Sequence, residues 1–148
     1  MRKTRILLID DEPSFTRLLR LNLEETGRYE VKEENKPLRA VATVEWFNPD
    51  LILLDIVMPE MDGADLAADL LKRPMLKNIP IVFLTAVVTK QETNQGDGFI
   101  GGNFFIAKPV TVREVTDCIE KLLRHRPVAA AEAEAVPGAV EYGMWPGR

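Results

Sequence analysis

The chain has 148 residues, a formal net charge of −4, and near-average shares of apolar (46%) and charged (28%) residues. Such values are typical of one globular domain with its own core. A single cysteine and a single histidine exclude a disulfide framework and a metal site built from several such residues. The acidic balance argues against nucleic-acid binding, and no apolar run reaches the roughly 20 residues that span a bilayer. We therefore expect a cytoplasmic protein without a membrane or nucleic-acid partner.

Five short apolar runs are predicted to be strands, and segments with helical spacing lie between them. The runs are Ile6–Ile9, Tyr29–Val31, Leu51–Leu54, Ile79–Leu84 and Phe104–Ala107. Three of them are apolar almost throughout, which is typical of strands covered on both faces. Strands that alternate with helices form parallel sheets with right-handed crossovers. The pattern predicts an α/β fold, a doubly wound five-stranded parallel sheet with helices on both faces.

Two helices are expected in the first third of the chain. The first begins after Pro13-Ser14 and stops at Gly27, and it presents one apolar face made of Phe15, Leu18, Leu19 and Leu23. The second covers Pro37–Phe47, with Asn35 as its cap and Trp46 as a packing residue.

Two more helices are expected further along. One runs from Gly63 to Lys72, and the last opens with a capping box in which the side chains of Thr111 and Glu114 bond each other's amides. Cys118 is interpreted as a small core residue of this last helix, and His125 as a residue that complements its dipole. The apolar face of the last helix is formed by Val115, Ile119, Leu122 and Leu123.

The composition changes near residue 126, which divides the chain into a domain over 1–126 and an Ala-, Pro- and Gly-rich tail over 127–148. Residues 89–98 contain no apolar side chain, so a stable helix is not expected there. Residues 96–101 match the pattern G-x-G-x-x-G. A dinucleotide-binding loop needs a strand before that pattern and a helix after it, so we do not interpret it as a nucleotide site.

Polar residues follow four of the predicted strands. Asp10 and Asp11 follow the first, Asp55 the third, Thr85 the fourth and Lys108 the fifth. The carboxyl ends of parallel strands meet at one edge of a sheet, where open α/β folds bind their ligands. Clustered carboxylates repel each other unless a cation is present, and an all-oxygen set favours Mg²⁺. A carboxylate beside Mg²⁺ can be a nucleophile toward phosphorus, and a hydroxyl and an ammonium can stabilise the phosphoryl oxygens.

These residues lie in four motifs, which are Ile9-Asp10-Asp11-Glu12-Pro13, Asp55-Ile56-Val57-Met58-Pro59-Glu60-Met61-Asp62-Gly63, Thr85-Ala86 and Phe105-Ile106-Ala107-Lys108-Pro109. With them, residues 3–126 resemble the receiver domain of a two-component response regulator, of the stand-alone kind typified by chemotaxis regulators. The resemblance implies a flavodoxin-like fold and a signalling protein that is switched by phosphorylation.

The resemblance also implies roles for the acidic residues. Asp55 corresponds to the phosphoacceptor of the family. Asp11 corresponds to the direct Mg²⁺ ligand, and Asp10 to a ligand that acts mainly through water. Asp55 itself and the backbone carbonyl of Val57 would complete the metal site.

Thr85 and Phe105 correspond to the switch, whereas Lys108 supplies a point charge to the phosphoryl oxygens. Thr85 resembles the hydroxyl that moves onto the phosphoryl group. Phe105 resembles the aromatic residue that turns inward with Thr85, and a cis Lys108–Pro109 bond is implied. The implied partners are a histidine kinase or phosphotransfer protein and an unidentified downstream protein, with the chain a monomer or weak homodimer.

Two other functions would use part of the same pattern. A phosphatase with an aspartyl-phosphate intermediate would need an acid two residues after the nucleophile, where this chain has Val57. A degenerate receiver that serves as an interaction module would not need the full set of acids, hydroxyl and ammonium. The sequence leaves open whether the chain belongs to a longer regulator.

Overall fold

The apolar runs form the strands of one central sheet in the computed structural model, which describes residues 2–86, 99–100 and 103–124. The strands are β1 (Thr4–Ile9), β2 (Tyr29–Glu34), β3 (Leu51–Asp55), β4 (Ile81–Thr85), β5 (Phe99–Ile100) and β6 (Asn103–Ala107). Their order across the sheet is β2-β1-β3-β4-β6-β5. Five of these strands are parallel, as predicted. The structure differs from the prediction in having a sixth strand, the two-residue β5, which pairs antiparallel with the start of β6 at the edge of the sheet.

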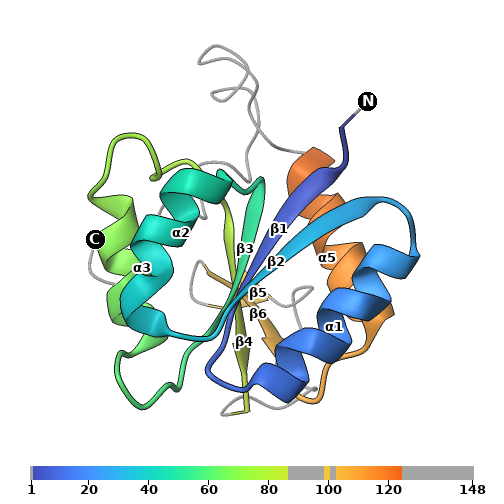
Figure 1. Ribbon diagram of the computed structural model, residues 1–148, viewed down its shortest axis with the longest axis horizontal. Helices are drawn as coiled ribbons and strands as arrows, with labels where there is room; N and C mark the ends of the chain where they lie inside the picture. The colour runs from blue at the N-terminus through green and yellow to red at the C-terminus, as the bar shows by residue number, and fades with distance from the viewer. Residues whose placement is uncertain (1, 87–98, 101–102, 125–148) are drawn as a thin grey trace.

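Helices cover both faces of this sheet (Figure 1). They are α1 (Pro13–Glu25), the short 3-10 helix η1 (Pro37–Arg39), α2 (Ala40–Phe47), α3 (Gly63–Leu71) and α5 (Val112–Arg124). Helices α1 and α5 lie on one side of the sheet, and α2 and α3 lie on the other. In the described part of the chain, no helix has the length and apolar character needed to cross a bilayer.

The strands separate two apolar layers, because successive side chains of a strand point to opposite faces. In β1, Ile6 and Leu8 pack in the layer beneath α1 and α5, whereas Leu7 and Ile9 pack in the layer beneath α2 and α3. All four side chains are fully buried, and each contributes about 1.5–3 kcal/mol by leaving water. This burial on both faces confirms the prediction made from the continuous apolar runs. It also holds the carboxyl ends of the strands, and the residues that follow them, in position.

Three local predictions are wrong. Asn35 does not cap the second helix, because its side-chain amide donates to the Asp10 carbonyl and to Thr16 Oγ1 instead. Leu18 is 63% exposed, whereas Leu19 and Leu23 of the same helix are buried, so Leu18 lies outside the face that packs on the core. Trp46 is not a packing residue of the core, because it is 66% exposed and its ring lies beside Lys32 on the surface.

Other local predictions are confirmed. Gly27 ends the first helical segment with a φ of 79°, a conformation that glycine adopts without strain. Thr111 and Glu114 form the capping box at the start of α5. Cys118 packs against the core, and burial raises the pKa of its thiol to about 12. The predictions for residues 89–98, His125 and the tail over 127–148 lie outside the described residues.

Candidate functional site

The strand ends bring the predicted polar residues to one edge of the sheet. Asp10 follows β1, Asp55 and Thr85 are the last residues of β3 and β4, and Lys108 follows β6. Carboxylate oxygens of Asp10, Asp11 and Asp55 lie within 4.8 Å of one another. The register of the parallel strands explains this meeting, because Ile9 pairs with Leu54 and Thr85 with Ala107.

Lys108 is the cation at the centre of this edge. Its Nζ lies 2.7 Å from Asp10 Oδ2, 3.7 Å from Asp55 Oδ2 and 3.6 Å from Glu12 Oε1. The ring of Phe15 lies under the ammonium, with its centroid 4.4 Å away. The contacts of Glu12 and Phe15 were not anticipated from the sequence, because each depends on how the start of α1 approaches β6.

Burial of several like charges dominates the electrostatics of the site. Burial raises the pKa of Asp55 to about 6, the negative charge of Asp10 adds to the rise, and Lys108 opposes it. Burial also raises the pKa of Asp10, although the hydrogen bond from Lys108 acts against this. Burial alone would lower the pKa of Lys108, but its hydrogen bond and attraction to Asp10 outweigh burial, and the pKa rises. More positive charge would therefore stabilise the ionised forms of Asp10 and Asp55.

The loop after β3 holds Asp55 through the backbone. The amide of Val57 donates to Asp55 Oδ1 over 3.4 Å, while the Val57 side chain points to solvent and is 63% exposed. The amide of Gly63 closes the loop by donating to the Ile56 carbonyl over 2.7 Å. A Cβ on Gly63 would lie 2.2 Å from the Asp55 carbonyl oxygen. The sequence motif contains Gly63, but the requirement for glycine at this position was not predicted, since it arises only from this close approach.

The two predicted switch residues lie on adjacent strands. Thr85 is fully buried, and its carbonyl accepts a hydrogen bond from the Lys108 amide over 2.8 Å. Phe105 is half-buried on β6, with its ring centroid 5.2 Å from that of Phe83. The Lys108–Pro109 peptide bond is cis, as expected.

The donor chemistry of the acidic cluster fits a hard divalent cation. Its three side chains offer carboxylate oxygens at close range, and Mg²⁺ is bound in proteins through one or two carboxylates together with waters and phosphoryl oxygens. Asp10 has a limited share in such a site, because its two oxygens already accept hydrogen bonds from Lys108 and from the Glu12 amide. Asp11 and Asp55 are the more direct candidates, and the division between direct and water-mediated ligands stays a prediction.

Comparison with known proteins gives a consistent family. The model of the response regulator receiver domain matches residues 6–120. The chain is 34% identical to the DNA-binding dual master transcriptional regulator RpaA of Synechocystis, over 88% of this chain and 54% of that protein. It is 38% identical to the transcriptional regulatory protein ResD of Bacillus subtilis, over 82% of this chain and 49% of that protein. The chain therefore spans about half the length of the curated relatives that it matches.

A solved structure has the same fold. The signal receiver domain of a signal transduction histidine kinase from Syntrophus aciditrophicus superposes with a TM-score of 0.69 at 30% identity, covering 86% of this chain and 96% of that one. The sheet order, the acidic edge and these matches agree. The chain belongs to the family of response regulator receiver domains, which accept a phosphoryl group on an aspartate in two-component signalling.

Proposed function

We propose that Asp55 is the phosphoacceptor of this chain. The observation that carries the proposal is the position of its carboxylate, which lies at the sheet edge beside Asp10 and Asp11 and 3.7 Å from Lys108 Nζ. A carboxylate oxygen of Asp55 attacks the phosphorus of the donor, a new O–P bond forms, and the bond to the leaving group breaks with its electron pair. The donor is a phosphohistidine of a histidine kinase or phosphotransfer protein, or a small acyl phosphate.

The surrounding residues have supporting roles in this proposal. Asp11, Asp55, the Val57 carbonyl and, through water, Asp10 would hold Mg²⁺, which would supply positive charge to the phosphoryl oxygens. Lys108, whose Nζ lies 3.7 Å from Asp55 Oδ2, supplies a further positive charge. The raised pKa of Asp55, about 6, still leaves most of the carboxyl ionised at neutral pH, as a nucleophile requires.

The output is proposed to be a change of surface rather than a further reaction. Thr85 moves onto the phosphoryl group, and Phe105 turns inward as Thr85 moves, so that a protein partner binds the altered face. A phosphatase is disfavoured because the position two residues after Asp55 is Val57, whose exposed side chain cannot act as a general acid. We accordingly propose a switch, not an enzyme, with no nucleic-acid target of its own.

Further parts of the proposal rest on family resemblance and sequence. The receiver domain occupies residues 1–126 and the tail 127–148. The chain works as a monomer or weak homodimer in the cytoplasm, where its kinase or phosphotransfer partner presents the phosphohistidine.

Phosphorylation by acetyl phosphate tests the proposal. The wild-type chain should gain one phosphoryl group in intact-mass measurements with Mg²⁺ and none with a chelator. Asp55→Asn should gain none under either condition. Asp65→Asn, which changes an exposed acid in the first turn of α3, is the matched control and should behave as wild type. Equal labelling of Asp55→Asn and wild type would refute the assignment.

A further inference from the structure

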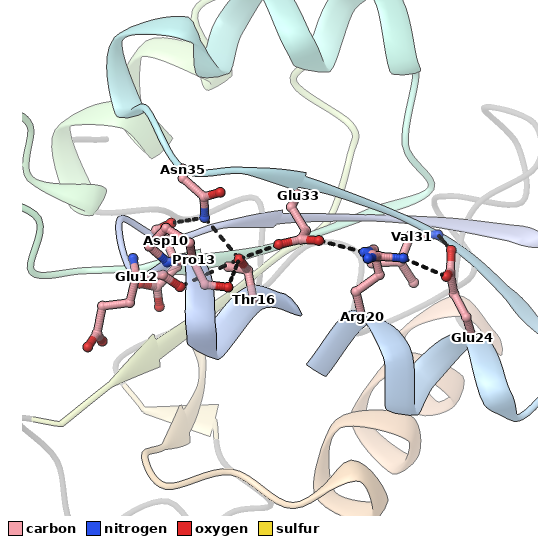
Figure 2. Close-up of polar contacts among 9 residues, drawn as sticks. All are labelled: Asp10, Glu12, Pro13, Thr16, Arg20, Glu24, Val31, Glu33 and Asn35. Atoms are coloured by element: carbon pink, nitrogen blue, oxygen red, sulfur yellow. Dashed lines mark hydrogen bonds and ion pairs between the residues drawn. The ribbon is translucent and has the colours of Figure 1, made fainter. Parts of the chain in front are cut away.

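The side chain of Asn35 ties the end of β2 to the acidic edge (Figure 2). Its Nδ2 donates to the Asp10 carbonyl over 2.8 Å and to Thr16 Oγ1 over 2.9 Å. Both amide protons are therefore used. The reversed amide would place two carbonyl oxygens against each other, so the hydrogen bonds fix the orientation of the side chain.

Asn35 is itself held by a polar chain that runs along α1. Thr16 is fully buried, and its hydroxyl donates to Glu33 Oε1 over 2.6 Å. Arg20 Nε donates to the other oxygen of Glu33 over 2.5 Å (Figure 2). Burial alone would raise the pKa of Glu33, but the hydrogen bonds from Thr16 and Arg20 outweigh it and the pKa falls. Glu33 is therefore a charged acceptor at neutral pH, and it directs the Thr16 hydroxyl proton away from Asn35.

The bond to the Asp10 carbonyl has a geometric consequence for Asp11. The peptide that joins Asp10 to Asp11 is planar. The direction of the Asp10 carbonyl therefore fixes the orientation of the peptide plane that leads into Asp11. The other polar groups of Asp10 also have partners. Its backbone amide donates to the Glu34 carbonyl, and its carboxylate accepts hydrogen bonds from the backbone amide of Glu12 and the ammonium of Lys108. Repulsion among the three carboxylates would otherwise favour a peptide that turns Asp11 away from Asp55.

We propose that Asn35 is a positioning residue that fixes the Asp10–Asp11 peptide, so that both carboxylates face Asp55, with Thr16 and Glu33 as its support. The inference rests on the proposed function, because the placement of Asp11 matters to phosphorylation only if the acidic cluster holds Mg²⁺. Outer partners of metal ligands typically change metal affinity by about 10–100-fold when they are removed.

Four variants test this role with Mg²⁺ alone as the ligand. Asn35→Ala removes the clamp, Thr16→Val removes the supporting hydroxyl at nearly constant shape, and Thr16→Ser retains the hydroxyl. Thr43→Val is the matched control, because the Thr43 hydroxyl also donates to a glutamate side chain at the end of β2, Glu34 Oε1 at 2.5 Å, and that bond does not involve Asn35 or Thr16. Amide chemical shifts followed during Mg²⁺ titration give the affinity, and urea unfolding gives the stability of each variant.

We expect Asn35→Ala to weaken Mg²⁺ binding about tenfold, Thr16→Val to weaken it less, and Thr16→Ser and Thr43→Val to leave it within twofold of wild type. The chemical shift of the Asp10 carboxyl carbon in the metal-free protein is a second measurement, and it should move in Asn35→Ala but not in Thr43→Val.

Unchanged affinity and an unchanged Asp10 shift in Asn35→Ala would overturn the inference. Equal losses of affinity in Asn35→Ala and Thr43→Val would also overturn it, since they would indicate general loosening. A wild-type chain that binds no Mg²⁺ would contradict the proposed function, and the Asp10 shift would then still decide the role of Asn35.

Discussion

At the scale of single residues, the site is organised by a shortage of positive charge. Asp10 and Asp55 are almost completely buried, and Lys108 Nζ lies 2.7 Å from the first and 3.7 Å from the second. One ammonium cannot neutralise the three carboxylates that meet here. The ionised acids therefore lower the stability of the folded protein. A bound cation, or a phosphoryl group with its cation, would change this loss of stability.

Replacing Asp55 by asparagine should stabilise the metal-free protein in a pH-dependent way. The rise of the Asp55 pKa from 3.8 to about 6 corresponds to about 3 kcal/mol against the charged form. Between these pH values the folded protein keeps a proton that the unfolded chain has lost, so wild-type stability falls as pH rises through the window. Urea unfolding in a chelator should show Asp55→Asn close to wild type at pH 4 and more stable by up to about 3 kcal/mol above pH 6. A constant difference across this range would contradict the assigned charge environment.

Removing the ammonium should raise the pKa of Asp55 further. Lys108 and, to a smaller extent, the hydrogen bond from the Val57 amide oppose the effects of burial and of Asp10 on this carboxyl, so Lys108→Met removes the larger of the two opposing influences. Carboxyl carbon chemical shifts followed by NMR against pH should give a midpoint for Asp55 above its wild-type value of about 6. Lys36→Met, which changes an exposed lysine after β2, should leave the midpoint in place. A lower midpoint in Lys108→Met would show that the ammonium does not act on Asp55 as described.

At the scale of elements, the loop between β3 and α3 sets the position of Asp55. A Cβ on Gly63 would meet backbone atoms, 2.2 Å from the Asp55 carbonyl oxygen and 2.8 Å from the Ile56 Cα. Backbone at the end of a buried central strand cannot move aside cheaply. Gly63→Ala should therefore cost about 1–3 kcal/mol, as other overpacked sites do, and slow phosphorylation by acetyl phosphate.

Gly27→Ala provides the contrasting glycine. Its added Cβ would meet open space, but its φ of +79° is strained for alanine, at about 1–2 kcal/mol. It should lose stability in urea and keep the wild-type rate of phosphorylation. If both glycine variants lowered the rate equally, the loop after β3 would have no special part in positioning Asp55.

The elements also show which parts of the structure can be predicted from the sequence. The strands and the capping box follow from local patterns, since apolar runs and the Thr111–Glu114 pair act within a few residues. The polar edge follows from topology, because parallel strands end together. The local pattern places Asn35 at a helix end, because a capping residue bonds amides within a few residues of itself. Its actual partner, the Asp10 carbonyl, lies 25 residues away in the sequence. The need for glycine at position 63 likewise arises from contact with β3, which no local pattern reveals.

At the scale of the whole molecule, the described helices and strands already enclose both apolar layers and the acidic edge. The layers draw on β1, β3, β4 and β6 and on helices from both faces of the sheet. The family model likewise ends at residue 120.

A chain cut after Arg126 should therefore fold and accept phosphate as the full chain does. Its urea midpoint and its labelling by acetyl phosphate should match those of residues 1–148. A large loss of stability in the shortened chain would show that the tail contributes to the domain, and the proposed boundary would be wrong.

Chemical mapping of the phosphorylated residue tests the central claim most directly. Borohydride reduces an aspartyl phosphate to homoserine, and trypsin then releases the peptide Ala40–Lys72, which also contains Asp50, Asp62, Asp65 and Asp69. After treatment with acetyl phosphate and Mg²⁺, fragment masses should place homoserine at position 55 and aspartate at the other four positions. Homoserine at any other position, with an unchanged Asp55, would contradict the account.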